Sequence, residues 1–234
     1  MPATVDNAGT ERALLQVGGV CAGVGSVVFA VVRILHGDTP GADAAASLDF
    51  VGGRPDYAAV HVVAVIAAFL TLAGLVGAAD SFREPVAWAL GRLGIVAATV
   101  GLAIFAVEST SEGLALPELS RAAASATPDQ RPDLVRAAHA VLAATHGPSL
   151  VAVTFLFGLT LVLIGAGLVR DSTYPSWLGW LGLLIGTLTF AAAVGQYLDP
   201  ALMPGFLIYG LLASVMAQLW IFALAVVMLR RARG

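Results

Sequence analysis

The sequence predicts an all-α membrane protein, a bundle of six transmembrane helices in a single domain. Of its 234 residues 59% are hydrophobic and only 12% are charged, and the mean hydropathy of +0.89 lies far from the balance of a soluble globular domain. Apolar runs of about 20 residues, the length that crosses a hydrocarbon core, recur along the whole chain. We therefore expect a lipid bilayer to be its surroundings.

Six runs are long enough to span the membrane. They cover residues 14–35, 57–79, 93–116, 148–169, 177–198 and 206–229. The first run lacks the positively charged start and the clean cleavage site of a signal peptide, so we expect it to be retained as a span.

The distribution of arginine predicts the topology. The last run ends in Arg230, Arg231 and Arg233, and basic residues beside a span favour the cytoplasmic side. With six spans, both termini are then cytoplasmic in a multi-pass protein of the cell membrane. The loops 36–56, 117–147 and 199–205 face outward, and prolines and glycines in the acidic first loop indicate turns rather than a folded domain there.

The third loop is long and rich in proline. Pro117, Pro128 and Pro132 argue against one continuous helix. Apolar residues recur at helical spacing between residues 134 and 145, which predicts an amphipathic helix on the bundle or on the membrane surface. Pro148 is expected in the first turn of the fourth span, a position that tolerates proline.

Composition and missing motifs exclude several classes of function. A net charge of −3 without a basic patch argues against a nucleic-acid partner. All twelve basic residues are arginine, so no lysine can form a Schiff base. The single cysteine, Cys21, allows neither an internal disulfide nor a dithiol redox cycle. No nucleotide-binding or zinc-protease motif is present, and no cofactor is assigned.

The third span carries two carboxylates, Glu108 and Glu112, which are the candidate catalytic residues. The stretch LGRLG at 90–94 is echoed by LGWLG at 178–182, as in duplicated membrane hairpins. Aligning the two stretches places Glu108 at the depth of Gln196. Small residues share the helical face of Glu108, so we expect this side chain to point into the bundle.

Other polar side chains are expected near the outer ends of the spans. The candidate ligand-binding residues are Tyr57, His61, His139, His146, Gln196, Tyr197 and Arg33. A carboxyl group withdrawn from water can act as a general acid or base, or the acids can simply pair with Arg33. Histidine and carboxylate also ligate metals, but two histidines seven positions apart on one helix are about 10 Å apart. No metal site is assigned.

The stretch Tyr174–Gly182, the pair His146-Gly147 and the arginine-terminated last span resemble a broad group of uncharacterised bacterial six-helix integral membrane proteins, classed as a domain of unknown function. This resemblance covers most of the chain. It implies the six-span architecture and transfers no catalytic residues.

These observations lead to one functional hypothesis and its alternatives. The hypothesis is a membrane protein whose outward-facing polar pocket binds a lipophilic small molecule, and both a binding protein and an enzyme using carboxylate acid–base chemistry fit it. The alternatives are a non-catalytic scaffold or transport accessory protein, and a metal- or haem-binding membrane protein.

Overall fold

A computed structural model describes residues 7–202 and 205–233, and in these ranges the chain forms helices and no strand. Within this part, six helical stretches are long and apolar enough to cross a membrane, which confirms the predicted fold class. The stretches are α1 (Asn7–His36), α3 (Tyr57–Asp80), α4 (Pro85–Ser125), α5 (Arg131–Val153) continued by η1 (Thr154–Leu159) and α6 (Thr160–Arg170), α7 (Ser176–Leu198), and η2 (Phe206–Met216) continued by α8 (Ala217–Arg231).

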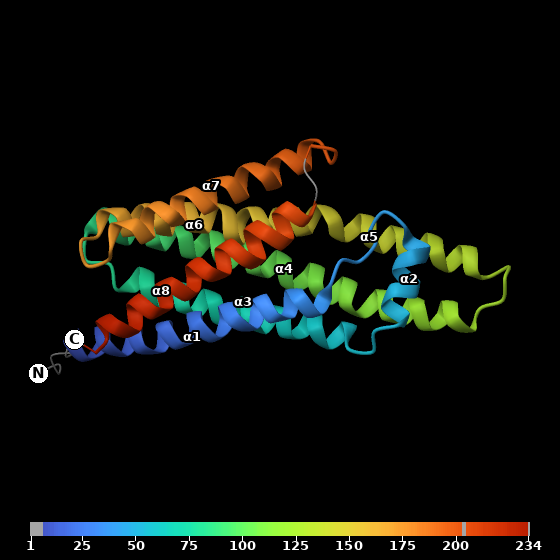
Figure 1. Ribbon diagram of the computed structural model, residues 1–234, viewed down its shortest axis with the longest axis horizontal. Coiled ribbons are helices and arrows are strands. Elements are labelled where there is room, and N and C mark those ends of the chain that lie inside the picture. The colour runs from blue at the N-terminus through green and yellow to red at the C-terminus, as the bar shows by residue number, and fades with distance from the viewer. Residues whose placement is uncertain (1–6, 203–204, 234) are drawn as a thin grey trace, which may run out of the picture.

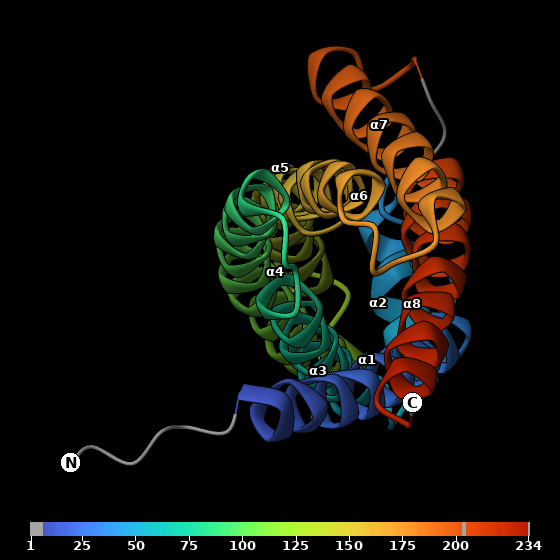
Figure 2. The same ribbon diagram turned by 90° about the vertical axis from the view of Figure 1, so that its left-hand side faces the viewer.

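The spanning helices form a ring in sequence order, which Figure 2 shows end-on. Each packs against its neighbours in the chain, and α8 closes the ring on α1. On α1, Gly19 and Gly23 face Ala225 of α8. A Cβ added at Gly19 would lie 3.3 Å from the carbonyl oxygen of Ala225, and a Cβ added at Gly23 would lie 3.6 Å from the Cβ of Ala225. This G-x-x-x-G face therefore allows α1 and α8 to pack closely, as small residues commonly do between membrane helices.

Helix α4 and the continuous helix formed by α5, η1 and α6 both extend well beyond the length of a membrane span (Figure 1). The 41 residues of α4 measure about 60 Å at 1.5 Å per residue, against a hydrocarbon core of about 30 Å. The predicted third loop is mostly the paired ends of α4 and α5, joined by a short turn. Pro117 and Pro148 lie inside these helices, so the expectation that Pro148 opens a span was wrong. Each proline removes one backbone hydrogen bond, and packing of the two helices against each other offsets that loss.

The first outer loop also contains a short helix that was not predicted. α2 (Ala44–Gly52) begins at Asp43, whose carboxylate accepts hydrogen bonds from the backbone N–H groups of Ala45 and Ala46, both at 3.0 Å. Its residues Leu48 and Val51 are buried against the extended ends of α4 and α5. The apolar positions were too few to be recognised in sequence, but they cover a surface that the long hairpin supplies.

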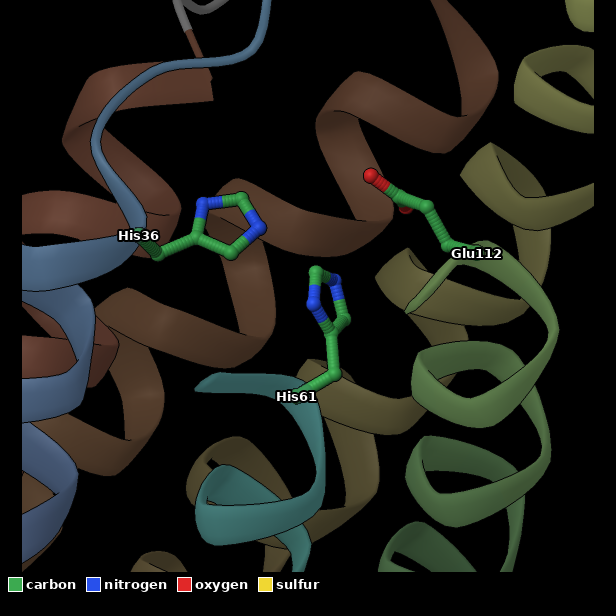
Figure 3. A group of neighbouring side chains, drawn as sticks. All are labelled: His36, His61 and Glu112. Carbon is green, nitrogen blue, oxygen red and sulfur yellow. The ribbon is translucent and has the colours of Figure 1, made fainter. Parts of the chain in front are cut away.

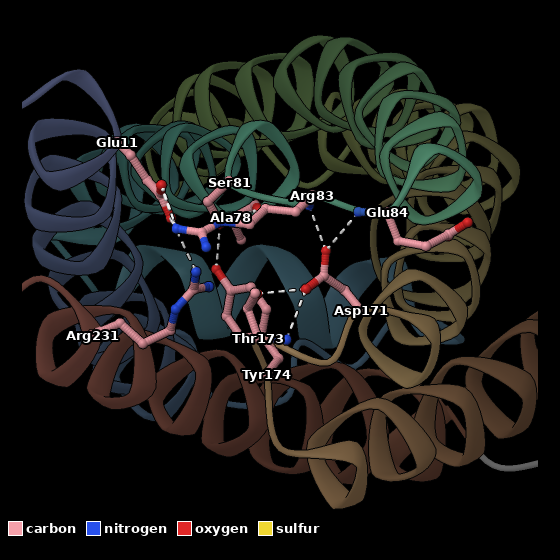
Figure 4. A network of polar contacts seen from close by, with 9 residues as sticks. All are labelled: Glu11, Ala78, Ser81, Arg83, Glu84, Asp171, Thr173, Tyr174 and Arg231. Atoms are coloured by element: carbon pink, nitrogen blue, oxygen red, sulfur yellow. Dashed lines mark hydrogen bonds and ion pairs between the residues drawn. The ribbon is translucent and has the colours of Figure 1, made fainter. Parts of the chain in front are cut away.

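At the other end of the bundle, a polar network joins the two short turns (Figure 4). The buried Asp171 carboxylate accepts hydrogen bonds from the backbone N–H groups of Arg83 (2.5 Å) and Glu84 (3.2 Å), and from the N–H and hydroxyl of Thr173. Burial by itself would raise the pKa of Asp171, but the hydrogen bonds from Thr173 and from the α3–α4 turn hold it below its ordinary value. Asp171 is thus an ionised clamp between the turns.

The same network brings the first and last helices together. Glu11 of α1 pairs with Arg83 at 2.8 Å and with Arg231 at 3.2 Å. The guanidinium of Arg231 lies 4.2 Å from the ring centre of Tyr174, whose hydroxyl is 2.5 Å from that of Ser81. Burial raises the pKa of Tyr174, so its hydroxyl stays protonated. The start of α1 and the end of α8 therefore lie on one side of the bundle (Figure 1), and that this side is cytoplasmic stays a prediction.

Candidate metal centre

Three helices bring two imidazoles and a carboxylate together at the end of the bundle opposite the start of α1 and the end of α8. His36 is the last residue of α1, His61 lies in the second turn of α3, and Glu112 lies beyond the middle of α4. One potential ligand atom from each lies within 4.8 Å of the other two, and Figure 3 shows the three side chains around a shared space. Glu112 is about 40 Å along α4 from its start, farther than the about 30 Å of a hydrocarbon core, so we expect the cluster near the membrane boundary.

Hydrogen bonds to carbonyl groups fix the proton on each imidazole. Nδ1 of His36 is 2.9 Å from the carbonyl oxygen of Gly37, and Nδ1 of His61 is 2.9 Å from that of Tyr57. A carbonyl oxygen only accepts, so Nδ1 carries a hydrogen in both rings, and in the neutral form of each ring Nε2 keeps a free lone pair. This is the arrangement that metal-ligating histidines commonly have, with a carbonyl orienting each ring.

The carboxylate is held by a tyrosine. The hydroxyl of Tyr57 donates a hydrogen bond of 2.8 Å to Oε1 of Glu112 and lies 3.2 Å from the hydroxyl of Thr39. Tyr57 is only 1% exposed, and its ring packs on that of His61 with centroids 4.6 Å apart. Tyr57 therefore orients both the carboxylate, through its hydroxyl, and an imidazole, through its backbone carbonyl.

A glycine and an arginine secure His36 at the end of α1. Gly37 has φ of +67°, the left-handed conformation that glycine adopts without steric cost and that commonly ends helices. Its carbonyl accepts from Nη1 of Arg33 at 2.5 Å as well as from His36. Arg54 donates to the otherwise free carbonyls of Leu35 and His36. The backbone that carries the imidazole is thus tied to the loop that follows.

A second glycine allows the close approach of His61. A Cβ at Gly113 would lie 2.7 Å from the Cβ of His61 and 2.8 Å from its Cγ. Because such contacts are too short for real atoms, only glycine permits α3 and α4 to pack here without displacement. Gly113 adjoins Glu112, so the same close contact brings that carboxylate near the imidazole.

Glu108 lies one turn from Glu112 on the buried face of α4. Its side chain is 8% exposed, which confirms that it points into the bundle, and it accepts a 3.3 Å hydrogen bond from the hydroxyl of Ser109. Glu108 and Glu112 interact electrostatically. A buried carboxylate thus stands beside the candidate metal ligands.

The other predicted site residues lie outside this cluster. Arg33 forms an ion pair with Asp38, and within residues 7–202 and 205–233 it forms no ion pair with Glu108 or Glu112, so the alternative in which Arg33 neutralises these acids is not seen. His139 and His146 are exposed on α5, and His139 lines a surface groove with α2. Gln196 is buried on α7, whereas Tyr197 is 60% exposed.

His36 is the member of the cluster that the sequence does not predict. The predicted first loop begins at this residue, and a histidine at the start of a loop carries no functional signal. The pair His36-Gly37 at the end of an apolar run was the available signal, because glycine commonly follows the last residue of a helix. Its distance from His61 and Glu112 could be known only from the packing of three helices.

The fold and the cluster define a class, a multi-pass α-helical bundle suited to a membrane with a polar site at one end. The chain matches no protein-family model, and no curated protein or solved structure is significantly similar to it. The resemblance to uncharacterised six-helix proteins therefore stays a prediction.

Proposed function

We propose that this protein is a membrane metalloprotein that binds one divalent transition-metal ion through His36, His61 and Glu112. The observation that carries the proposal is the meeting of two imidazoles and one carboxylate, each oriented by a hydrogen bond and supplied by a different helix. Imidazole and carboxylate together favour zinc or another late transition metal over calcium or magnesium.

The geometry supports zinc in particular. Zn–N and Zn–O distances of about 2.0–2.2 Å put tetrahedral ligand atoms about 3.3 Å apart. The three candidate atoms lie within 4.8 Å of one another. Side-chain rotations that shorten the distances between them by up to about 1.5 Å would bring them to the spacing of zinc ligands. Two histidines and one glutamate leave the fourth position for water or a substrate, as in catalytic zinc sites.

Metal analysis of the purified protein tests the proposal. After chelator treatment and reloading, we expect one zinc per chain by elemental analysis, and a large loss of affinity in His36→Ala, His61→Ala and Glu112→Gln. The matched controls are His139→Ala and His146→Ala, which remove exposed histidines outside the cluster and should bind zinc as the wild type does. Wild-type protein without stoichiometric zinc, or zinc lost equally in the controls, would overturn the proposal.

A second function rests on Glu108. A buried carboxylate one turn from a candidate ligand can serve as a general base, and the cluster's place near the membrane boundary favours a lipophilic substrate. Lipid extracts of cells expressing the wild type or Glu108→Gln test this enzymatic reading. Unchanged lipophilic metabolites, together with lower thermal stability of the variant, would leave Glu108 a structural residue.

A further inference from the structure

Four exposed arginines at one end of the bundle form no ion pair within residues 7–202 and 205–233. We call them the terminal arginine surface: Arg12, Arg170, Arg230 and Arg233. They lie at the end that carries the start of α1 and the end of α8, away from the metal cluster. Because a guanidinium cannot be deprotonated in a protein, this surface carries four positive charges that no described carboxylate neutralises.

The carboxylates that the described chain places at this end are already engaged. Glu11 pairs with two other arginines, and Asp80 pairs with a third. Asp171 is the buried clamp between the turns, and the carboxylate of Glu84 accepts a backbone hydrogen bond at the start of α4. This end therefore holds an excess of positive charge, although the whole chain has a net charge of −3.

The polar network in Figure 4 brings the terminal arginine surface together from three parts of the chain. Each of its members lies within two residues in sequence of Glu11, Asp171 or Arg231. Glu11 of α1 pairs with Arg231 of α8 at 3.2 Å. The guanidinium of Arg231 lies 4.2 Å from the ring centre of Tyr174, in the same turn as Asp171. The start of α1, the end of α8 and the α6–α7 turn are therefore neighbours, and each contributes exposed arginine.

Three exposed tryptophans indicate the depth of this end in a bilayer. Trp88, Trp177 and Trp180 are 46%, 54% and 62% exposed. They lie in the first two turns of α4 and α7, the helices that begin at this end. Exposed tryptophans of membrane helices lie at the level of the lipid headgroups. Arginines at the ends of the same helices therefore face lipid phosphates.

We propose that the terminal arginine surface binds the headgroups of anionic phospholipids. A guanidinium donates two parallel hydrogen bonds to phosphate oxygens, and each basic residue beside a span strengthens binding to anionic lipid about fivefold. Phosphatidylcholine carries the same phosphate, but its own ammonium group neutralises it. The predicted cytoplasmic orientation of this end agrees with the proposal, because that leaflet contains anionic lipids.

Quenching of tryptophan fluorescence by brominated lipids tests the proposal, because bromine quenches on contact and the three exposed tryptophans lie at this end. The protein is reconstituted in phosphatidylcholine vesicles that contain brominated phosphatidylglycerol or brominated phosphatidylcholine. At low salt we expect the brominated phosphatidylglycerol to bind beside the tryptophans about fivefold more strongly, the effect of one arginine, or more. In about 1 M salt, where the Debye length is about 3 Å, the two lipids should bind almost equally.

Substitutions identify the arginines that are responsible. Arg170→Gln should weaken the preference, and replacing all four members of the terminal arginine surface by glutamine should abolish it. The matched control is Arg121→Gln, which removes an exposed arginine at the opposite end that also lacks an ion pair in the described ranges, and it should change nothing. Thermal unfolding checks the fold of each variant, and the salt comparison uses the wild type alone.

Equal quenching by the two lipids at low salt, a preference that persists in about 1 M salt, or a preference unchanged in the fourfold variant would overturn the proposal. Loss of the preference in inorganic phosphate, but not in chloride of the same ionic strength, would assign the surface to free phosphate and overturn it as well. Zinc takes no part in this measurement, so its result is independent of the proposed function.

Discussion

Replacing Gly113 by alanine should weaken metal binding at the candidate site without replacing any of the three proposed ligands. The added Cβ would lie 2.7 Å from the Cβ of His61, about 0.7 Å short of the 3.4 Å at which ordinary contact begins. Both atoms sit close to helix backbones, so α3 and α4 must separate or the imidazole must turn. Overpacking of this kind costs about 1–3 kcal/mol, and loss of ligand positioning lowers metal affinity about 10–100-fold.

The control is Gly147→Ala, which also places alanine in a helix but has no atom within 4 Å of the new Cβ. Removing glycine from a helix interior is favourable by up to about 1 kcal/mol, so this variant should be as stable as the wild type or more so. Zinc affinity is measured by competition with a chelator, and stability by unfolding in mixed detergent micelles. Gly113→Ala with wild-type affinity and stability would refute the reasoning.

Three other substitutions probe the structure. Tyr57→Phe removes the hydrogen bond to Glu112 and should lower zinc affinity about 10–100-fold, measured by the same competition; unchanged affinity would show that the carboxylate needs no support. Gly37→Ala forces a non-glycine residue into the left-handed region, at a cost of about 1 kcal/mol, and should weaken zinc binding through His36; a variant with normal stability and zinc binding would contradict this. Asp171→Asn should lower the free energy of unfolding by about 1–3 kcal/mol, because hydrogen bonds to an ionised acceptor are lost.

The Asp171 clamp also has a pH signature. Its folded-state pKa lies below the ordinary value of about 3.9, so its stabilisation is complete above that value and disappears as the pH falls through the folded-state pKa. Unfolding measured from pH 7 downward should therefore show an acid-dependent loss that Asp171→Asn lacks. An identical pH dependence in both proteins would exclude the clamp as its source.

Much of the fold follows from composition and period. Six long apolar runs allow little besides six helices, because a bilayer leaves backbone groups no other way to pair. The inward direction of Glu108 could also be predicted, since the small residues of α4 mark the face that packs. The paired ends of α4 and α5 could not be predicted, because Pro117 and Pro148 locally disfavour a helix. Only contacts between the two helices offset the backbone hydrogen bonds that these prolines remove.

The candidate site also combines residues that the sequence predicts with one that only the structure reveals. Sequence by itself selected Tyr57, His61 and Glu112 as polar groups at the ends of apolar spans, where burial makes such groups costly unless they are used. It did not select His36, because nothing local distinguishes a histidine at a helix end. Tertiary structure decided the cluster: Gly37 ends α1 at His36, and Gly113 admits His61 beside Glu112. Ligand geometry depends on distances between helices, and those are set by side-chain packing that no single stretch of sequence contains.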